Sequence, residues 1–263
     1  MNTNKKLGLA VALLVMAIFL APAAAKASPV SGLDNLVAST YLGGDGGDAF
    51  YSGVILDSSG NVYAVGSAYS ANFPTTTGAY QGTDGGGTSD AVISKFNSNL
   101  TQLLVSTYFG GDGKDTALNI KIDSAGNIFV VMVVGSTYMT TTTGAVQGTI
   151  GGAYDFFVAK FNSGLTSVLA GTYFGGTQNE RPMNMILDAS DNVYINGRTA
   201  STNLTTTTGA YQGIYGGGGN DVMIVKFNSG LTSTLASTYL GGSGAEFAGG
   251  LIFDSSGNIF VSG

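Results

Sequence analysis

Short apolar runs separated by turns rich in Gly, Asn, Asp and Ser follow one another along most of the chain. The runs are three to seven residues long and rich in β-branched and aromatic side chains, which is typical of strands. They fall into four kinds, which follow one another as the first to fourth strands of a repeating unit. First strands are expected at 53–56, 184–187 and 250–253, and second strands at 62–65, 128–131, 193–195 and 259–261. Third strands are expected at 91–96, 156–161 and 222–227, and a fourth strand at 103–109. No segment after residue 27 shows a helical pattern, so we expect an all-β fold.

Most of these runs are continuously apolar instead of alternating with polar residues, which indicates strands that are buried on both faces. The runs belong to a repeat marked by the hexapeptides STYLGG, STYFGG, GTYFGG and STYLGG, which begin at residues 39, 106, 171 and 237. Four-stranded units that bury both faces against their neighbours are typical of the blades of a β-propeller. The sequence therefore predicts antiparallel four-stranded blades with about 66 residues per repeat.

Several further motifs recur in the same order, including DSSGNVY at 57–63, SKFNSNLT at 94–101 and TTTGAYQG at 75–82. Together these motifs resemble the bacterial SBBP repeat family and, more distantly, the NHL-type propeller repeat with its D-x-x-G-N-[VI]-[YF] hairpin. The resemblance covers residues 36–263. It implies an extracellular β-propeller and brings no established catalytic residues.

The repeats do not form a whole number of blades. The segment 36–42 reads as a fourth strand without the first three, which would complete the last blade and latch a closed ring. The last unit ends after its second strand. We therefore expect three full blades plus partial units, an incomplete ring that is a fragment of a larger propeller. Residues 130–139 lack the Gly of the equivalent strands, so that strand is expected to run longer.

The first 27 residues have the order of a secretory signal peptide: Lys5 and Lys6, an apolar stretch from Leu7 to Leu20, and small residues up to Ala27. The apolar stretch is shorter than the roughly 20 residues that span a bilayer. The expected organisation is a signal peptide at 1–27, a linker at 28–35 and propeller repeats at 36–263. The protein is then secreted, extracellular or on the cell surface, without membrane insertion after cleavage.

Composition excludes several kinds of chemistry. The chain has no Cys and no His, which removes disulfides, Cys-type zinc sites and Ser-His-Asp or Cys-His catalysis. Its net charge of −6 argues against a nucleic-acid partner, since phosphate binding needs a basic patch.

Antiparallel order places the loops after second and fourth strands at one end of every blade. We call this end, with the long loops such as 66–90 and the Gly-rich connectors such as 43–48, the long-loop face. Long loops on a rigid scaffold are where binding usually occurs. The connectors carry acidic residues that are the candidate ligand-binding residues: Asp45, Asp48, Asp112, Asp115, Glu180 and Glu246. Paired Asp in such loops are also candidates for Ca²⁺, although no EF-hand loop is present; no other cofactor is expected.

Other side chains of the repeat have simpler interpretations. Tyr80 and Tyr211 either stack on sugar rings or, as we expect, pin the long loop to the blade. The aromatic column of the second strands is expected in the core: Tyr63, Phe129, Tyr194 and Phe260. Lys95, Lys160 and Lys226 are expected to pair with turn carboxylates. The Gly or Asn at the third position of the NSGLT turns is expected in a left-handed conformation.

The favoured function is a non-catalytic propeller that binds an extracellular polysaccharide or surface protein through the long-loop face. Alternatives are a structural or display segment of a larger surface protein and a carbohydrate-active hydrolase or lyase. Site residues of a propeller enzyme should break the repeat, and no single polar cluster does so clearly in the sequence.

Overall fold

The computed structural model describes residues 37–263, so the predicted signal peptide and linker lie outside the described residues. Fourteen strands are present: β1 Ala49–Leu56, β2 Val62–Ala68, β3 Asp90–Phe96, β4 Leu103–Phe109, β5 Asp115–Ile122, β6 Ile128–Val134, β7 Asp155–Phe161, β8 Val168–Phe174, β9 Glu180–Leu187, β10 Val193–Thr199, β11 Asp221–Phe227, β12 Thr234–Leu240, β13 Leu251–Phe253 and β14 Ile259–Val261. Within this range no helix is long and apolar enough to cross a membrane.

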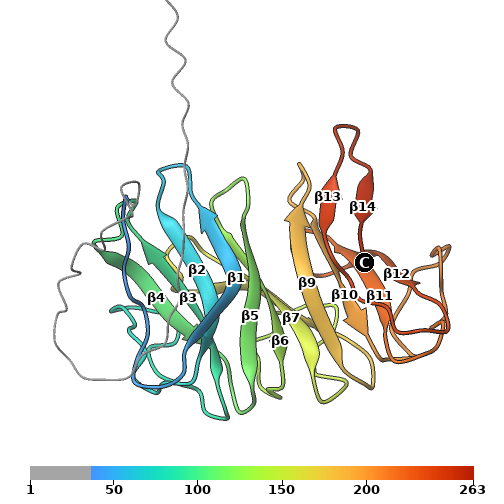
Figure 1. Cartoon of the computed structure of the whole chain (residues 1–263), viewed down its shortest axis with the longest axis horizontal. Helices are drawn as coiled ribbons and strands as arrows, with labels where there is room; N and C mark the ends of the chain where they lie inside the picture. The colour runs from blue at the N-terminus through green and yellow to red at the C-terminus, as the bar shows by residue number, and fades with distance from the viewer. Residues whose placement is uncertain (1–36) are drawn as a thin grey trace, which may run out of the picture.

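The strands form three four-stranded sheets and one two-stranded sheet, each in sequence order and each antiparallel. We call β1–β4, β5–β8 and β9–β12 blades one, two and three. The sheets do not close into a ring, and the first hairpin of every unit points to the same end, the top of Figure 1. The predicted all-β fold of blade-like units in an incomplete propeller is confirmed.

The blades pack face to face through their apolar side chains. Strand β5 lies beside β1 and β2, and β9 lies beside β5 and β6, so the first strands are neighbours from blade to blade (Figure 1). One buried cluster joins blades one and two around Val65, Phe109 and Phe157, and a second joins blades two and three around Phe174 and Phe227. Burial from both sides explains why the strands are continuously apolar.

Two predictions about strands are wrong. Residues 37–42 form no strand, because a fourth strand pairs with a third strand and the last unit of this sequence supplies only β13 and β14. Strand β6 is no longer than β2 or β10, although Met132 replaces their Gly. Directly after the strand, the Gly135 N–H donates to the carbonyl of Lys114 in the connector.

Strands β1 and β9 begin four residues earlier than the apolar runs indicated, and β5 is a first strand that no predicted run covered. As a result Asp115 and Glu180 open strands instead of lying in loops. The added residues at 49–52, 115–118 and 180–183 mix polar and apolar side chains, and their pairing with the second strand is interrupted by a bulge or register shift.

Each full blade carries one ion pair at its tight-turn end. Lys95, Lys160 and Lys226 lie 3.0, 2.9 and 3.4 Å from Asp57, Asp123 and Asp188, as the sequence predicted. The same ammonium groups lie 4.6–4.9 Å from the ring centroids of Tyr63, Phe129 and Tyr194. Those three rings are buried as expected. Phe260 is 56% exposed, because the fourth unit has no third strand here to cover it.

The NSGLT turns contain backbone strain at a position that the sequence did not indicate. Leu100, Leu165 and Leu231 have φ of 51–57°, whereas Gly164 and Gly230 do not have positive φ. A left-handed Leu is costly. Leu165 and Leu231 are fully buried, and their carbonyls accept the N–H of Tyr80 and Val146 from the long loop of the preceding blade. Because the half-buried Leu100 adopts the same φ without such an interblade bond, the conformation belongs to the turn itself, in which Asn97, Asn162 and Asn228 accept the N–H of the residue after the Leu.

The long loop of each blade folds back along the outer edge of the fourth strand. In blade one the Thr76 N–H donates to the Ser106 carbonyl, and the Tyr108 N–H donates to the Gln81 carbonyl, both over 3.0–3.1 Å. The same bonds recur on β8 and β12. The expectation that the whole loop lies on the long-loop face was wrong, because the otherwise unpaired edge of the fourth strand takes up its middle part. Only the ends of the loop and the connectors form that face.

The Tyr of each hexapeptide clamps this loop. The hydroxyls of Tyr108, Tyr173 and Tyr239 donate to the carbonyls of Ser70, Ser136 and Ser201, and accept the N–H groups of Phe73, Met139 and Leu204. All three tyrosines are almost fully buried. The hydroxyl thus satisfies two backbone groups of the loop at once, and this explains why the hexapeptide keeps its Tyr.

Tyr80 pins the loop as predicted: its ring packs edge-on against Phe109 and Phe161, and its hydroxyl lies 2.7 Å from that of Thr140. The equivalent Tyr211 is 86% exposed, so the same prediction was wrong there. The difference arises because Phe161 belongs to the third strand of the next blade, which blade three lacks in this sequence.

We expect Tyr173→Phe to lower the free energy of unfolding by about 1–3 kcal/mol, since it leaves the Met139 N–H and the Ser136 carbonyl buried without a partner. Urea denaturation would measure the change. The matched control is Tyr138→Phe, because Tyr138 is 79% exposed, and it should change stability by less than ~0.5 kcal/mol. Equal effects of the two substitutions would contradict the role of the buried hydroxyl.

Candidate functional site

Four of the predicted site residues occupy equivalent positions and close the Gly-Gly connectors. The carboxylates of Asp48, Asp115, Glu180 and Glu246 accept the N–H of Gly44, Gly111, Gly176 and Gly242 over 2.6–3.1 Å. Each acid lies four residues after its Gly. The spacing G-x-x-x-[DE] therefore describes a loop that is closed by its own carboxylate.

Three of these acids also hold the end of the second strand. The hydroxyl of Ser70 donates to Asp48 over 2.7 Å, that of Ser136 donates to Asp115, and that of Thr199 donates to Glu180 over 2.6 Å. Asp115 and Glu180 are 0% and 1% exposed. Their oxygens are occupied by protein hydrogen bonds, so these side chains first of all organise the connector.

The other two predicted residues, Asp45 and Asp112, are exposed. Asp112 accepts the N–H and the hydroxyl of Thr137 over 2.8 and 2.7 Å, and these bonds lower its pKa. At Asp45 the backbone N–H donates to Asn72 Oδ1 over 3.0 Å. The structure does not bring the six acids together. That they bind a ligand stays a prediction, for which Asp45 and Asp112 are the accessible members.

A second acidic column opens the third strands and was overlooked in the sequence. Asp90, Asp155 and Asp221 are fully buried and accept an N–H from Gly85, Gly151 and Gly216 over 2.6–2.7 Å. The sequence does contain a signal for this column. The dipeptides SD, YD and ND, at 89–90, 154–155 and 220–221, place an Asp at the start of the third strand in each of the three full repeats.

The Gln of the TTTGAYQG motif connects this column to the connectors. In blade two the Gln147 Nε2 donates to Asp155 over 3.2 Å, and its Oε1 accepts the Gly175 N–H over 3.0 Å. Gln81 and Gln212 repeat both bonds in blades one and three. One amide therefore holds together the long loop, the third strand and the connector.

The two acidic columns meet across the first connector Gly. A Cβ on Gly175 would lie 2.6 Å from Asp155 Oδ1 and 2.5 Å from Glu180 Oε2, so only Gly fits. Gly110 stands in the same way beside Asp90 and Asp115, and Gly241 beside Asp221 and Glu246. Each junction between consecutive units thus holds one pair of facing carboxyls.

Burial raises the pKa of the buried acids. It raises the pKa of Asp90 to about 7 and that of Glu180 to about 7, and it raises the pKa values of Asp115, Asp155 and Asp221 as well. Asp155 and Glu180 are close enough to hydrogen-bond when one of them is protonated. Oδ1 of Asp90 and of Asp221 has no hydrogen-bond partner among the described residues.

Backbone N–H groups donate to the carboxyls of these pairs, as those of Gly85, Gly151 and Gly176 do, whereas a Ca²⁺ ion needs six to eight oxygen ligands. That Ca²⁺ binds at the connectors stays a prediction. Residues 37–263 contain no group of three or more acidic side chains that could hold a metal ion.

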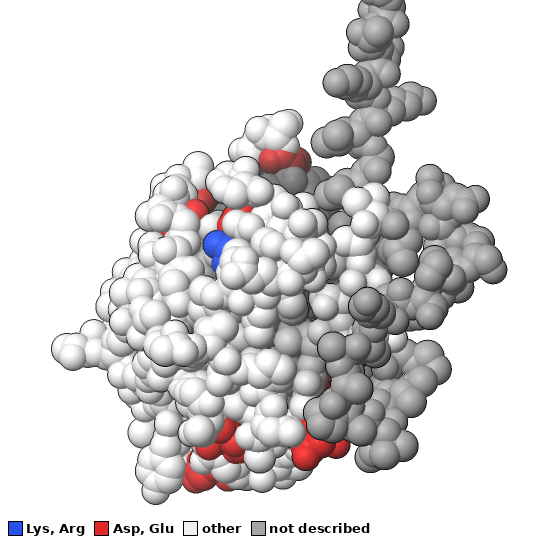
Figure 2. Space-filling view, turned by 90° about the vertical axis from the view of Figure 1, so that its left-hand side faces the viewer, with Lys and Arg blue, Asp and Glu red and all other residues white. Residues whose placement is uncertain are grey.

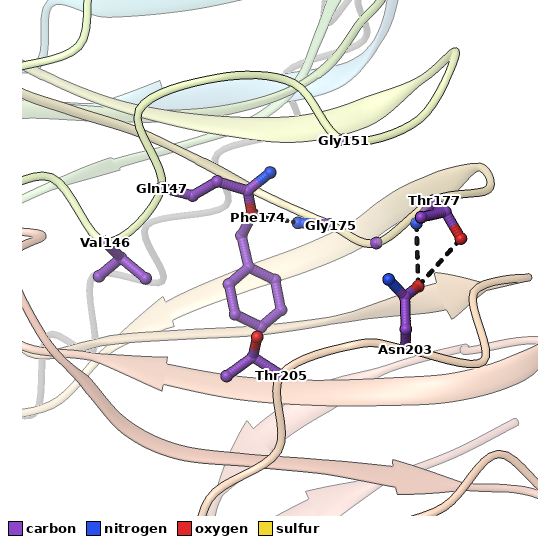
Figure 3. A pocket seen from close by; sticks show the side chains of 9 residues that line it. Val146, Gln147, Gly151, Phe174, Gly175, Thr177, Asn203 and Thr205 are labelled. Carbon is purple, nitrogen blue, oxygen red and sulfur yellow. Dashed lines mark hydrogen bonds between the residues drawn. The ribbon is translucent and has the colours of Figure 1, made fainter.

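Two clefts open near the connectors. One, of about 340 Å³, lies between the long loops of blades two and three and has no charged residue in its lining. Figure 3 shows the Gln147 amide reaching Gly175, the bonds from Thr177 to Asn203, and the Phe174 ring pointing toward Thr205. The other cleft, of about 460 Å³, lies at the long-loop face beside β5 and β9, and Lys114, Arg181 and Arg198 are in its lining.

Comparison with protein families gives one match. The family model SBBP, a beta-propeller repeat, matches residues 39–74, from the first hexapeptide through β2 to Pro74. The chain carries an SBBP-type β-propeller repeat. The predicted resemblance is confirmed for this segment, which contains Asp48 with its Gly44 and Ser70 partners. No curated protein matches the chain.

The acidic pairs predict a pH dependence of stability. Because the folded chain keeps protons on Asp90 and Glu180 up to pH about 7, whereas ordinary values are 3.8 and 4.5, it binds more protons than the unfolded chain between these limits. The stability that these groups contribute is complete below pH 3.8 and is lost as the pH rises through about 7.

We therefore expect Asp90→Asn with Glu180→Gln to flatten the decline of the melting temperature between pH 4.5 and about 7. Thermal melts across this range would measure it. Asp112→Asn is the control, because its pKa is lowered and lies below the window. A profile of the double variant parallel to that of the unaltered chain would show that the pairs do not titrate there.

Proposed function

We propose that this chain is part of a secreted or cell-surface β-propeller that binds an extracellular partner at the long-loop face and catalyses no reaction. The observation that carries the proposal is the cleft of about 460 Å³ at that face, which is bounded by the ends of strands from two blades. Concave sites of this size, on rigid elements, are typical of ligand binding.

The framework of the cleft is rigidly held. The backbone N–H groups of Asp115, Glu180 and Glu246 donate to the carbonyls of Ser89, Tyr154 and Asn220 over 2.8 Å, which ties each connector to the preceding blade. Side chains at these positions are therefore presented without a large loss of conformational entropy on binding.

Two arguments support a non-catalytic role. The sequence has no His or Cys, and the buried acids of the connectors, Asp115 and Glu180, accept hydrogen bonds from the connectors and the second strands. Secretion is supported by the signal-peptide pattern at 1–27, and the acidic net charge of −6 argues against nucleic acid. The proposal includes no cofactor; the partner is an extracellular polysaccharide or a surface protein.

A panel of polysaccharides and surface-protein extracts would test the proposal with the secreted chain. Tyr69 and Tyr154 line the cleft and are partly exposed, so Tyr69→Ala with Tyr154→Ala should weaken binding by about tenfold or more. Tyr211→Ala is the control, because Tyr211 lies in the loop over β12 and is 86% exposed.

Loss of binding in the control but not in the cleft variant would place the site elsewhere and overturn the proposal. Turnover of a polysaccharide that one carboxylate substitution abolishes would favour an enzyme. No binding to any member of the panel would favour a structural or display segment.

A further inference from the structure

The basic residues of this acidic protein are distributed unevenly. Of ten Lys and Arg residues, Lys5, Lys6 and Lys26 precede the described range. Among the remaining seven, Lys95, Lys160 and Lys226 form the ion pairs at the tight turns. Lys114, Arg181 and Arg198 all line the cleft of about 460 Å³, and within residues 37–263 none of them has an ion pair. The seventh is Lys121 on β5.

The side of the molecule in Figure 2 differs from this cleft in how its charges are distributed. Its charged atoms gather near the upper and lower ends, and most of the surface between them is uncharged. A cleft with three basic side chains is therefore a local concentration of positive charge in a chain whose net charge is −6.

Two of the three basic residues stand directly opposite each other. Arg181 on β9 and Arg198 on β10 are paired in the register, so their side chains leave the sheet on the same side. Like charges at directly opposed positions destabilise a sheet. The equivalent pairs are Ala49 with Ser67 in blade one and Thr116 with Val133 in blade two. The paired arginines therefore break the repeat at a cost to stability.

The carboxyl in the lining does not neutralise them. Glu180 is 1% exposed and is occupied by the Gly176 N–H and the Thr199 hydroxyl. The Arg198 guanidinium instead lies 5.4 Å from the ring centroid of Phe247, which holds it in place and leaves its N–H groups available.

The rest of the lining has the properties of a sugar site. The rings of Tyr69 and Tyr154 are 37% and 38% exposed, so each presents part of an amphipathic face. Asn179 and Asn220 add amide groups that both donate and accept hydrogen bonds. The Lys114 ammonium lies 6.0 Å from the Tyr69 centroid. Aromatic faces, amides and unpaired cations in one cleft match a ring that carries both hydroxyls and a carboxylate.

We propose that this cleft binds a carboxylated sugar, such as a uronic acid unit of an acidic polysaccharide, through Arg181, Arg198 and Lys114. The guanidinium groups take the carboxylate in bidentate geometry, and the tyrosines and asparagines contact the ring and its hydroxyls. This inference rests on the proposed function and names its ligand class. A polyphosphate backbone is disfavoured, because it needs a basic surface larger than one cleft.

The test is calorimetric titration of the secreted chain with tri-galacturonic acid, and with the neutral trisaccharide maltotriose for comparison. Arg181→Thr with Arg198→Ser introduces residues that other repeats carry at these positions. We expect this double variant to bind tri-galacturonic acid at least about tenfold more weakly, since charge-assisted hydrogen bonds are lost. Its melting temperature should not fall, because the repulsion between the arginines is removed.

Lys121→Thr is the matched control, because it removes a positive charge on β5 outside the cleft lining and should leave the affinity unchanged. Equal affinity of the double variant and the unaltered chain, equal affinity for maltotriose, or equally strong binding of inorganic phosphate would overturn the inference. If the unaltered chain binds a neutral glycan or surface protein from the panel but not tri-galacturonic acid, the proposed function stands while this inference fails. If nothing in the panel binds, both fail.

Discussion

The outer edge of the fourth strand in each blade must have its backbone groups satisfied, and much of the structure depends on how this is done. The long loop returns along that edge and supplies the donors and acceptors, as Thr76 and Gln81 do for Ser106 and Tyr108. The buried Tyr hydroxyl then holds the loop by two further bonds. This arrangement accounts for the long repeat, for the conserved spacing within the chain between loop and hexapeptide, and for a blade without an exposed outer edge.

Because the loop is used in this way, the surface available for binding is smaller than the loop lengths indicate. The connectors dominate the long-loop face, and they are organised by facing carboxyls around a Gly with no room for a side chain. The Gln of each long loop, such as Gln147, bonds both the Asp of the third strand and the connector Gly. The acids that appeared to be binding residues are thus mostly part of the scaffold, and burial raises the pKa of two of them, Asp115 and Glu180.

Against this repeated scaffold, a binding residue is recognisable as a departure. Arg181 and Arg198 replace small or uncharged pairs of the other blades and face each other without a neutralising group among the described residues. A scaffold in which the same contacts recur tolerates such a local cost, since its stability is distributed over many nearly identical interactions. The differences between repeats therefore indicate the function of this chain more clearly than the shared motifs do.

The sequence by itself determined the four-stranded blades, the tight turns and the ion pairs of Lys95, Lys160 and Lys226, because these depend on local pattern and on neighbours within one repeat. The residue of the NSGLT turn that takes positive φ was not predicted, because the hydrogen bonds that the Asn side chain accepts within the turn place this φ on the Leu and not on the Gly before it. Nor did the sequence separate Tyr80 from Tyr211, whose surroundings come from the next blade. Only the tertiary structure placed Arg181 beside Arg198 and Lys114 in the same cleft, since register and blade packing join positions that no motif connects.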